Sequence, residues 1–201
     1  MLKIWGRANS SNVMKVLWLC DELGIAHERI DAGGAFGKTR EPFYLAMNPN
    51  SRVPTIEEPD GYSLWESHSI LRYLVATRAP GHAVHPTEPR ARGNVERWMD
   101  WLLAALNPPY MGLFREAKKP AAERAATWAA DAKDMAAQLS VLDGAMGKPW
   151  IAGASMSLAD IALAPIVHRC LGFPIDLPKL ETLRAWHGRV SERPAFKTAA
   201  V

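Results

Sequence analysis

The stretch from Asn48 to Ile56 constrains the fold more than any other part of the sequence, because it sets a proline directly before a short apolar run. Proline has no N–H to donate to a β-ladder, so the Val53-Pro54 step belongs at the start or edge of a strand. An X-Pro bond is also where the cis form costs little, and cis-prolines sit in tight turns. We therefore predict a strand entered at Pro54, a cis Val53-Pro54 bond, and an outward-facing Val53 backbone with unpaired N–H and C=O groups.

A second strand and a helix follow this proline in the pattern. Residues 59–61 have turn chemistry, residues 62–65 form a strand pattern, and apolar residues then recur on one helical face. Glu66 and Ser67 stand at the start of that helix, where free N–H groups and the helix dipole favour a carboxylate ligand. An extended peptide could pair with the free Val53 backbone by strand addition. The combination predicts a pocket for a small peptide with a free amine and free carboxylates.

The part of the chain before these elements alternates between strands and helices. Its predicted elements are a strand at 2–6, a helix at 13–23, a strand at 25–31 and a short helix at 41–47. The turn Ser10-Ser11-Asn12 is a natural cap for the first helix, and Gly24 is a natural stop. The full order is strand, helix, strand, helix, strand, strand, helix, which indicates an α+β domain.

The pattern changes at residues 79–93, where proline and glycine recur and helical periodicity fails. We predict a linker there, between a first domain at 1–78 and an all-helical domain at 94–201. The helical stripes predicted after the linker lie at 95–106, 125–142, from 158 onward and at 180–190. Asn107-Pro108-Pro109 should stop the first of them, and Ser157 to Asp160 forms a capping box in its Asp form.

Composition excludes several classes of protein. Of the 201 residues, 48% are hydrophobic and 22% are charged, as in a globular chain, and the net charge is only +3. The sequence has no Lys/Arg run of the kind that binds a nucleic-acid phosphate backbone, and no apolar run is long enough to span a membrane. Cys20 and Cys170 are isolated and form neither a disulfide framework nor a CxxC pair. We expect a cytoplasmic protein with no metal, no nucleic-acid partner and no membrane partner.

Arg52-Val53-Pro54 followed by Glu66-Ser67 resembles the glutathione site of the glutathione S-transferase superfamily, and the resemblance extends over nearly the whole chain. It implies a thioredoxin-like N-terminal domain, βαβαββα with a mixed sheet of four strands, followed by an all-α C-terminal domain. It also implies glutathione as co-substrate without any cofactor, a small hydrophobic electrophile, a role in detoxification and a homodimer. A serine at position 10, with neither cysteine nor tyrosine there, is similar to a serine-type, bacterial-looking class.

The resemblance places the reacting sulfur at the turn that ends the first strand. A thiolate is the reactive form of a thiol, and a donor hydroxyl with free helix N–H groups stabilises that anion. Ser10 matches the serine of the family best, Ser11 is a competitor, and Asn12 resembles the amide that a bacterial branch uses. All three residues could instead only cap the helix, which is their common role at this position.

The remaining contacts to glutathione follow from the same resemblance. It assigns Arg52 and, more weakly, Thr39 to the glycine end, and the Val53 backbone to the cysteinyl residue. It assigns Glu66 to the γ-glutamyl amine and Ser67 to the γ-glutamyl carboxylate. In the helical domain we expect two aromatic residues to line the electrophile pocket, Trp101 and Tyr110, while Trp98 and Met99 belong to the core.

Two other functions remain open on this scaffold. A glutathione-dependent disulfide reductase or peroxidase would use a thiolate that Asn12 helps to hold. A non-enzymatic member of the superfamily would use the fold for contacts with other proteins; such members tend to lose glutathione-site residues, and this chain keeps them.

Overall fold

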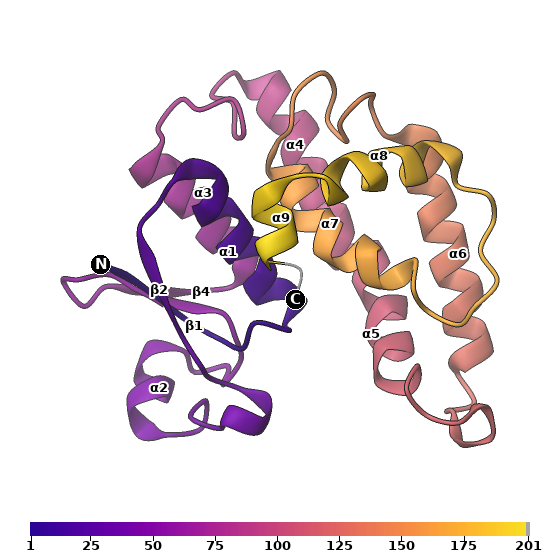
Figure 1. Ribbon diagram of the computed structural model, residues 1–201, viewed down its shortest axis with the longest axis horizontal. Coiled ribbons are helices and arrows are strands. Elements are labelled where there is room, and N and C mark those ends of the chain that lie inside the picture. The colour runs from indigo at the N-terminus through magenta and orange to yellow at the C-terminus, as the bar shows by residue number, and fades with distance from the viewer. Residues whose placement is uncertain (200–201) are drawn as a thin grey trace. The chain divides into compact units, whose positions relative to one another are not determined.

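The computed structural model describes residues 1–199, and its N-terminal part contains the predicted mixed sheet (Figure 1). Its four strands are β1 (Leu2–Trp5), β2 (His27–Ile30), β3 (Thr55–Glu57) and β4 (Ser63–Trp65). They lie in the order β2-β1-β3-β4, with β1 parallel to β2 and antiparallel to β3, and with β3 antiparallel to β4. Because β1 and β2 are parallel, both end at the edge of the sheet where β3 begins.

Three α-helices and one short 3₁₀ turn complete this part of the chain. They are α1 (Ser11–Leu23), η1 (Gly34–Phe36), α2 (Pro42–Met47) and α3 (Ser67–Arg78). The helices α1 and α3 lie on one face of the sheet and α2 lies on the other (Figure 1). Gly24 ends α1 in a left-handed conformation with φ 63°, as a C-terminal glycine allows. The element order βαβαββα is confirmed, and with it the thioredoxin-like fold.

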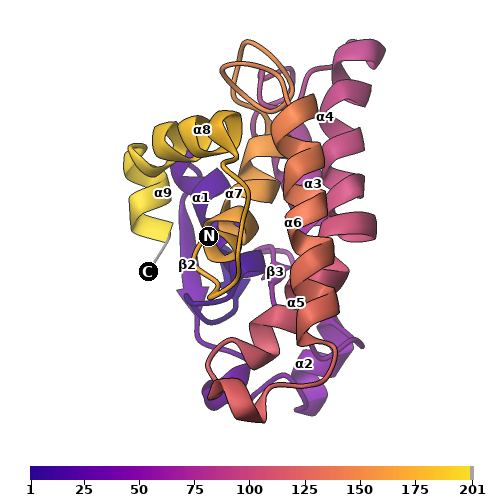
Figure 2. The same cartoon turned by 90° about the vertical axis from the view of Figure 1, so that its right-hand side faces the viewer.

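The second part of the chain is helical. Its elements are α4 (Pro89–Trp101), the π-helical turn η2 (Leu102–Leu106), α5 (Asn107–Glu116), the 3₁₀ turn η3 (Ala121–Glu123), α6 (Trp128–Ala145), α7 (Leu158–Cys170) and α8 (Glu181–Ser191). In Figure 2, α6 runs alongside the succession of α4 and α5. Trp98 and Met99 are buried, as expected for core positions.

Two boundaries in this helical part differ from the sequence pattern. The helix α4 begins at Pro89, inside the stretch predicted as linker, because proline is well tolerated in the first helical turn. Asn107-Pro108-Pro109 does not end the helical run either. Both prolines lie in the first turn of α5, and the π-helical turn before them joins α5 to α4.

The predicted capping box at the start of α7 is confirmed. Asp160 is fully buried, and its Oδ2 accepts hydrogen bonds from the N–H and the hydroxyl of Ser157 at 2.8 and 3.0 Å. Its Oδ1 accepts from the N–H of Ile151 at 2.9 Å and from Nε1 of Trp186 at 2.8 Å. One carboxylate therefore joins the start of α7 to the preceding loop and to α8.

The described residues fall into two compact units. One unit comprises Met1–His85 together with the described residues from Glu192 on, and the other comprises Pro86–Ser191. The short helix α9 (Pro194–Ala199) belongs to the first unit, where Phe196 packs edge-on against Trp18 at 4.9 Å between ring centroids. This return of the chain is a feature that the sequence pattern did not indicate. Within residues 1–199, no helix combines the length and the apolar character needed to cross a membrane.

Candidate functional site

Ser10 occupies the N-cap position of α1 but does not cap the helix with its side chain. Its backbone is extended, with φ −91° and ψ 122°, and its C=O accepts the first helical hydrogen bond from Met14 N–H at 2.9 Å. The side chain is 9% exposed, and its hydroxyl has no hydrogen-bond partner among the described residues. The hydroxyl is therefore available, at the start of α1, to a group that needs a donor.

Asn12 and Ser67 bring the beginnings of α1 and α3 together. The hydroxyl of Ser67 donates to Oδ1 of Asn12 at 3.5 Å, a long hydrogen bond between residues 55 apart in sequence. Ser67 is buried and is the first residue of α3, whereas Asn12 is exposed. Ser11, the first residue of α1, is buried. Two helix N-termini thus face the same edge of the sheet, which favours the binding of anionic groups there.

The loop before β3 is held in place by a buried network of hydrogen bonds. The carbonyl of Arg52 accepts from the hydroxyl of Tyr44 at 2.7 Å and from Nδ2 of Asn48 at 2.9 Å. Both donors also contact Oγ1 of Thr55, each at 2.9 Å. The network fixes the backbone on either side of Val53, whose own N–H and C=O have no hydrogen-bond partner within the described residues. The Val53-Pro54 bond is cis, as predicted.

Glu66 stands at the N-cap position of α3 in an unusual backbone conformation. Its φ is +73° and its ψ is 112°, a region that residues other than glycine rarely adopt. The side chain is exposed, caps nothing, and forms no hydrogen bond or ion pair with the described residues. Such conformations concentrate at ligand sites, and this one presents a free carboxylate beside Ser67.

The two residues expected at the glycine end of glutathione both lie in the first unit. Thr39 is half-buried, and its N–H donates to the carbonyl of Gly37 at 2.9 Å. Arg52 is exposed at the edge of the sheet where β3 begins. The side chains of both residues have no partner among the described residues.

Arg7 is a cation at this edge of the sheet that the sequence pattern did not single out. Its side chain lies against two glycines of the loop after β2: a methyl group on Gly34 would come within 3.2 Å of its Cδ, and one on Gly33 within 3.6 Å of its Nη1. The same position on Gly33 would lie 3.2 Å from Cγ1 of Val53. The half-buried guanidinium has no hydrogen bond or ion pair among the described residues. The only signal in the sequence was the pair Gly33-Gly34. The reason why these positions suit glycine depends on their contacts with Arg7 and Val53, which lie elsewhere in the sequence.

Lys15 and His68 form a second feature that the sequence did not reveal. Both are 1% exposed, and Nζ of Lys15 lies 3.2 Å from Nε2 of His68. Burial lowers the pKa of Lys15 to about 7, although the charge of Glu66 acts in the opposite direction. Burial and the charges of Lys15 and Arg72 lower the pKa of His68 to about 2. The two cysteines have no such activation, since burial raises the pKa of Cys20 to about 12 and that of Cys170 further still.

The aromatic residues expected at the electrophile pocket lie in the second unit. Trp101 is half-buried at the end of α4 and packs edge-on against Trp98, with 5.4 Å between centroids. Tyr110 in α5 is 4% exposed and stacks on Phe114 at 5.6 Å. Their role at an electrophile pocket stays a prediction.

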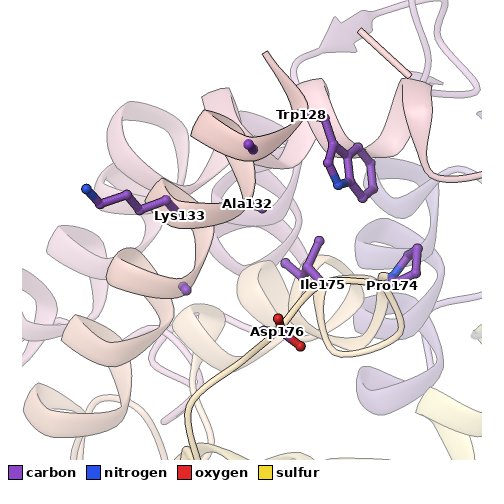
Figure 3. Close-up of a pocket in the computed structure, with 8 residues that line it drawn as sticks. Trp128, Ala132, Lys133, Pro174, Ile175 and Asp176 are labelled. Atoms are coloured by element: carbon purple, nitrogen blue, oxygen red, sulfur yellow. The ribbon is translucent and has the colours of Figure 1, made fainter. Parts of the chain in front are cut away.

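A pocket of about 680 Å³ lies within the second unit, between α6 and the segment after α7 (Figure 3). Trp128 faces Pro174 and Ile175 across it, while the side chain of Lys133 points away. The pocket contains none of the predicted site residues. Within residues 1–199, no group of three or more His, Cys, Asp or Glu side chains could hold a metal ion.

A thioredoxin-like unit with two helix N-termini at one edge of its sheet, followed by a helical unit, is the arrangement expected of a glutathione transferase. The chain matches the patterns of two families, the glutathione S-transferase N-terminal domain over residues 9–77 and the C-terminal domain over residues 106–194. The protein belongs to the glutathione S-transferase family.

Among its relatives, the chain is 33% identical over 201 residues to glutathione S-transferase GstB of Escherichia coli K12, covering 98% of this chain and 96% of that protein. It is 29% identical over 197 residues to disulfide-bond oxidoreductase YfcG of the same organism, covering 94% of this chain and 89% of that protein. Among solved structures, it is similar to the theta class glutathione S-transferase of Xanthomonas axonopodis pv. citri with glutathione bound, with a TM-score of 0.91 and 38% identity over 100% of this chain and 97% of that chain.

Proposed function

We propose that the protein conjugates the thiolate of glutathione to an electrophilic carbon of a small hydrophobic substrate. The observation that carries the proposal is the hydroxyl of Ser10, which stands at a helix N-cap, makes no cap bond and has no partner among the described residues. A structural serine at this position would bond the N–H groups of its own helix. A hydroxyl without a partner among the described residues suits a ligand sulfur.

The chemistry requires the thiol of glutathione to lose its proton near neutral pH. Lowering its pKa by about two units takes roughly 3 kcal/mol. A charge-assisted hydrogen bond from Ser10, together with the dipole at the start of α1, is of that magnitude. In this proposal Ser10 stabilises the thiolate as it forms and as it attacks the electrophile. The leaving group or the opened electrophile takes up the electron pair displaced from carbon.

The rest of glutathione is assigned to the groups around Ser10. Ser67 and the start of α3 take the γ-glutamyl carboxylate, and Glu66 takes the γ-glutamyl amine. The free N–H and C=O of Val53 pair with the cysteinyl backbone, as in strand addition. The glycine carboxylate is assigned to Arg52 and Thr39. The hydrophobic co-substrate is assigned to the helical unit, at Trp101 and Tyr110.

We also propose that the protein works as a cytoplasmic homodimer. Both cysteines within the described residues are buried and free, which suits a reducing compartment. Dimerisation is a proposal from the family. Sedimentation velocity at micromolar concentration should give the mass of two chains, and a monomer across that range would contradict it.

A second candidate is a glutathione-dependent disulfide reductase. Asn12 is exposed and accepts a hydrogen bond from Ser67, which supports a role for its amide at the start of α1. The relative YfcG is named a disulfide-bond oxidoreductase. In this reaction the glutathione thiolate would attack a disulfide and displace one of its thiols. A second glutathione thiolate would then attack the mixed disulfide, which releases the other thiol and forms oxidised glutathione.

The test is a titration followed by a substrate screen. Calorimetry with glutathione should give one site per chain, and Ser67→Ala should weaken binding about tenfold or more through loss of a hydrogen bond to a carboxylate. The purified protein is then assayed with aryl halides, epoxides, isothiocyanates, peroxides and mixed disulfides. Turnover of carbon electrophiles supports the transferase, turnover of disulfides alone supports the reductase, and no binding at millimolar glutathione contradicts both.

A further inference from the structure

Lys15 of α1 and His68 of α3 form a buried pair, and His68 directly follows Ser67 in the first turn of α3. Lysine is almost never fully buried unless an acidic group is bonded to it. Here the ammonium is 1% exposed and its hydrogen-bond partner is the Nε2 atom of an imidazole at 3.2 Å. His68 is the second residue of α3 and equally buried, and its Nδ1 atom has no partner among the described residues. A buried positive charge next to an anion-binding helix terminus therefore lacks a bonded counter-charge.

The charged groups on the neighbouring elements do not supply that counter-charge. On α3 they are Arg72 and Arg78, of which Arg78 is paired with Glu58. The other neighbouring charges are paired elsewhere: Lys3 of β1 with Glu57, Glu22 of α1 with Arg193, and Lys197 of α9 with Glu192. Glu66 is the acidic group whose charge acts on Lys15, and it forms no ion pair with it.

We propose that Lys15 is a positioning residue that provides the counter-charge for the ligand carboxylate at Ser67, and that ligand binding there is coupled to uptake of a proton by Lys15. The proposal rests on the proposed function, since it takes the carboxylate to be that of the γ-glutamyl group. His68 holds the ammonium in place by accepting its hydrogen bond, which requires the neutral ring with its proton on Nδ1. The proton taken up comes from the buffer and ends on Nζ of Lys15.

The direction of the coupling follows from the burial of Lys15. Without ligand, its pKa is lowered to about 7, so about half of the molecules carry the charge at pH 7. A bound carboxylate favours the charged form and raises that pKa. For a rise of about one unit, the charged fraction at pH 7 increases to about nine tenths, an uptake of about 0.4 proton per ligand. The affinity for the ligand is then highest below pH 7. It falls as the pH rises through 7 to 8, and above pH 8 it is about tenfold lower.

The experiment uses S-methylglutathione, because this compound carries the peptide part of glutathione without a thiol that could release its own proton. Calorimetric titration at pH 7 is done in phosphate and in Tris, whose different ionisation enthalpies reveal the number of protons exchanged. An uptake of about 0.4 proton supports the proposal. Binding with no proton exchange, or with release, overturns it while leaving the proposed function intact, and no binding at all overturns both.

Two variants and one control assign the proton to Lys15. Lys15→Met should abolish the uptake, weaken binding about tenfold at pH 6 and flatten its pH dependence. Lys15→Arg keeps a charge that does not titrate, so it should restore affinity without restoring uptake. Lys133→Met removes an exposed lysine of α6 that has no ion pair among the described residues, and it should behave as the parent protein. Unchanged uptake in Lys15→Met contradicts the assignment; if a variant does not fold, the two-buffer measurement on the parent protein still decides.

Discussion

The hydroxyl of Ser10 is left unused by the helix that it begins, and its removal should therefore affect chemistry more than folding. A hydrogen bond to a charged group contributes about 1.5–3 kcal/mol, so Ser10→Ala should lower turnover about 10- to 100-fold. The loss raises the pKa of the bound thiol, which shifts the pH–rate profile upward. Glutathione affinity should change little, because its carboxylates are held elsewhere. Initial rates from pH 6 to 9 and a calorimetric Kd check these expectations.

Two neighbouring variants separate the candidates in this turn. Ser11→Ala should stay near the parent activity. Should Asn12→Ala show the upward shift of the pH profile while Ser10→Ala leaves it unchanged, the serine assignment is wrong. The disulfide reductase then becomes the better proposal, since it relies on an amide-held thiolate.

Lys15 should lower the stability of the folded protein. Its pKa falls from 10.5 to about 7 on burial, so the folded state binds fewer protons than the unfolded state between those values. The cost is fully present below pH 7 and disappears as the pH rises toward 10.5. Lys15→Met should therefore stabilise the fold at pH 6 by roughly 1–4 kcal/mol, with a smaller gain at pH 9. Urea unfolding at both pH values measures this; equal gains at both would contradict it.

The residues that the sequence could indicate are those whose role depends on near neighbours in the chain. Pro54 and Ser67 can be recognised from the residues next to them, which have the pattern of a strand and of a helix. The structure has a strand after Pro54 and a helix that begins at Ser67, as predicted. The contact of Lys15 with His68 joins residues 53 apart, and such a pair cannot be predicted before the packing of α1 on α3 is known. Arg7 was missed for the same reason.

Among the helices, the run from α4 to α5 shows how local signals can mislead. Prolines usually end helices, yet Pro89 lies in the first turn of α4, where the missing N–H has no partner to lose, and Pro108 lies just after the π-helical turn η2. The π-helical turn η2 lies where α4 gives way to α5. Apolar periodicity located both helices correctly, but the way in which they join depends on tertiary packing.

The carboxylate of Asp160 should be the single most important polar group of the helical unit. Asp160→Ala leaves the N–H groups of Ile151, Ser157 and Trp186 buried without an acceptor. At about 1–3 kcal/mol for each unpaired group, the free energy of unfolding should fall by at least about 3 kcal/mol. Urea denaturation followed by tryptophan fluorescence measures the loss. Asp134→Ala on the exposed face of α6 is the control, and an equal effect of the two changes would contradict this role.

The first unit of the molecule contains both ends of the described chain, residues 1–85 and the described residues from Glu192 on. Phe196 is 2% exposed against Trp18, and Arg193 donates two hydrogen bonds of 2.6 Å to Glu22. Phe196→Ala should destabilise the protein by about 3–5 kcal/mol, as large-to-small changes in a core do. Thermal and urea unfolding test this against Thr198→Ala, an exposed neighbour in the same helix. A Phe196→Ala protein as stable as the control would mean that α9 is dispensable.

The pairing of Glu22 with Arg193 also sets an order of events during protein synthesis, because 171 residues separate the two. At about 5–20 residues per second, the ribosome needs roughly 10–30 s to deliver the second partner after the first. During that interval Trp18 lacks the ring of Phe196 that packs against it in the folded protein. The first unit therefore reaches its final packing only after the whole helical unit has been made, although nearly all of its residues leave the ribosome first.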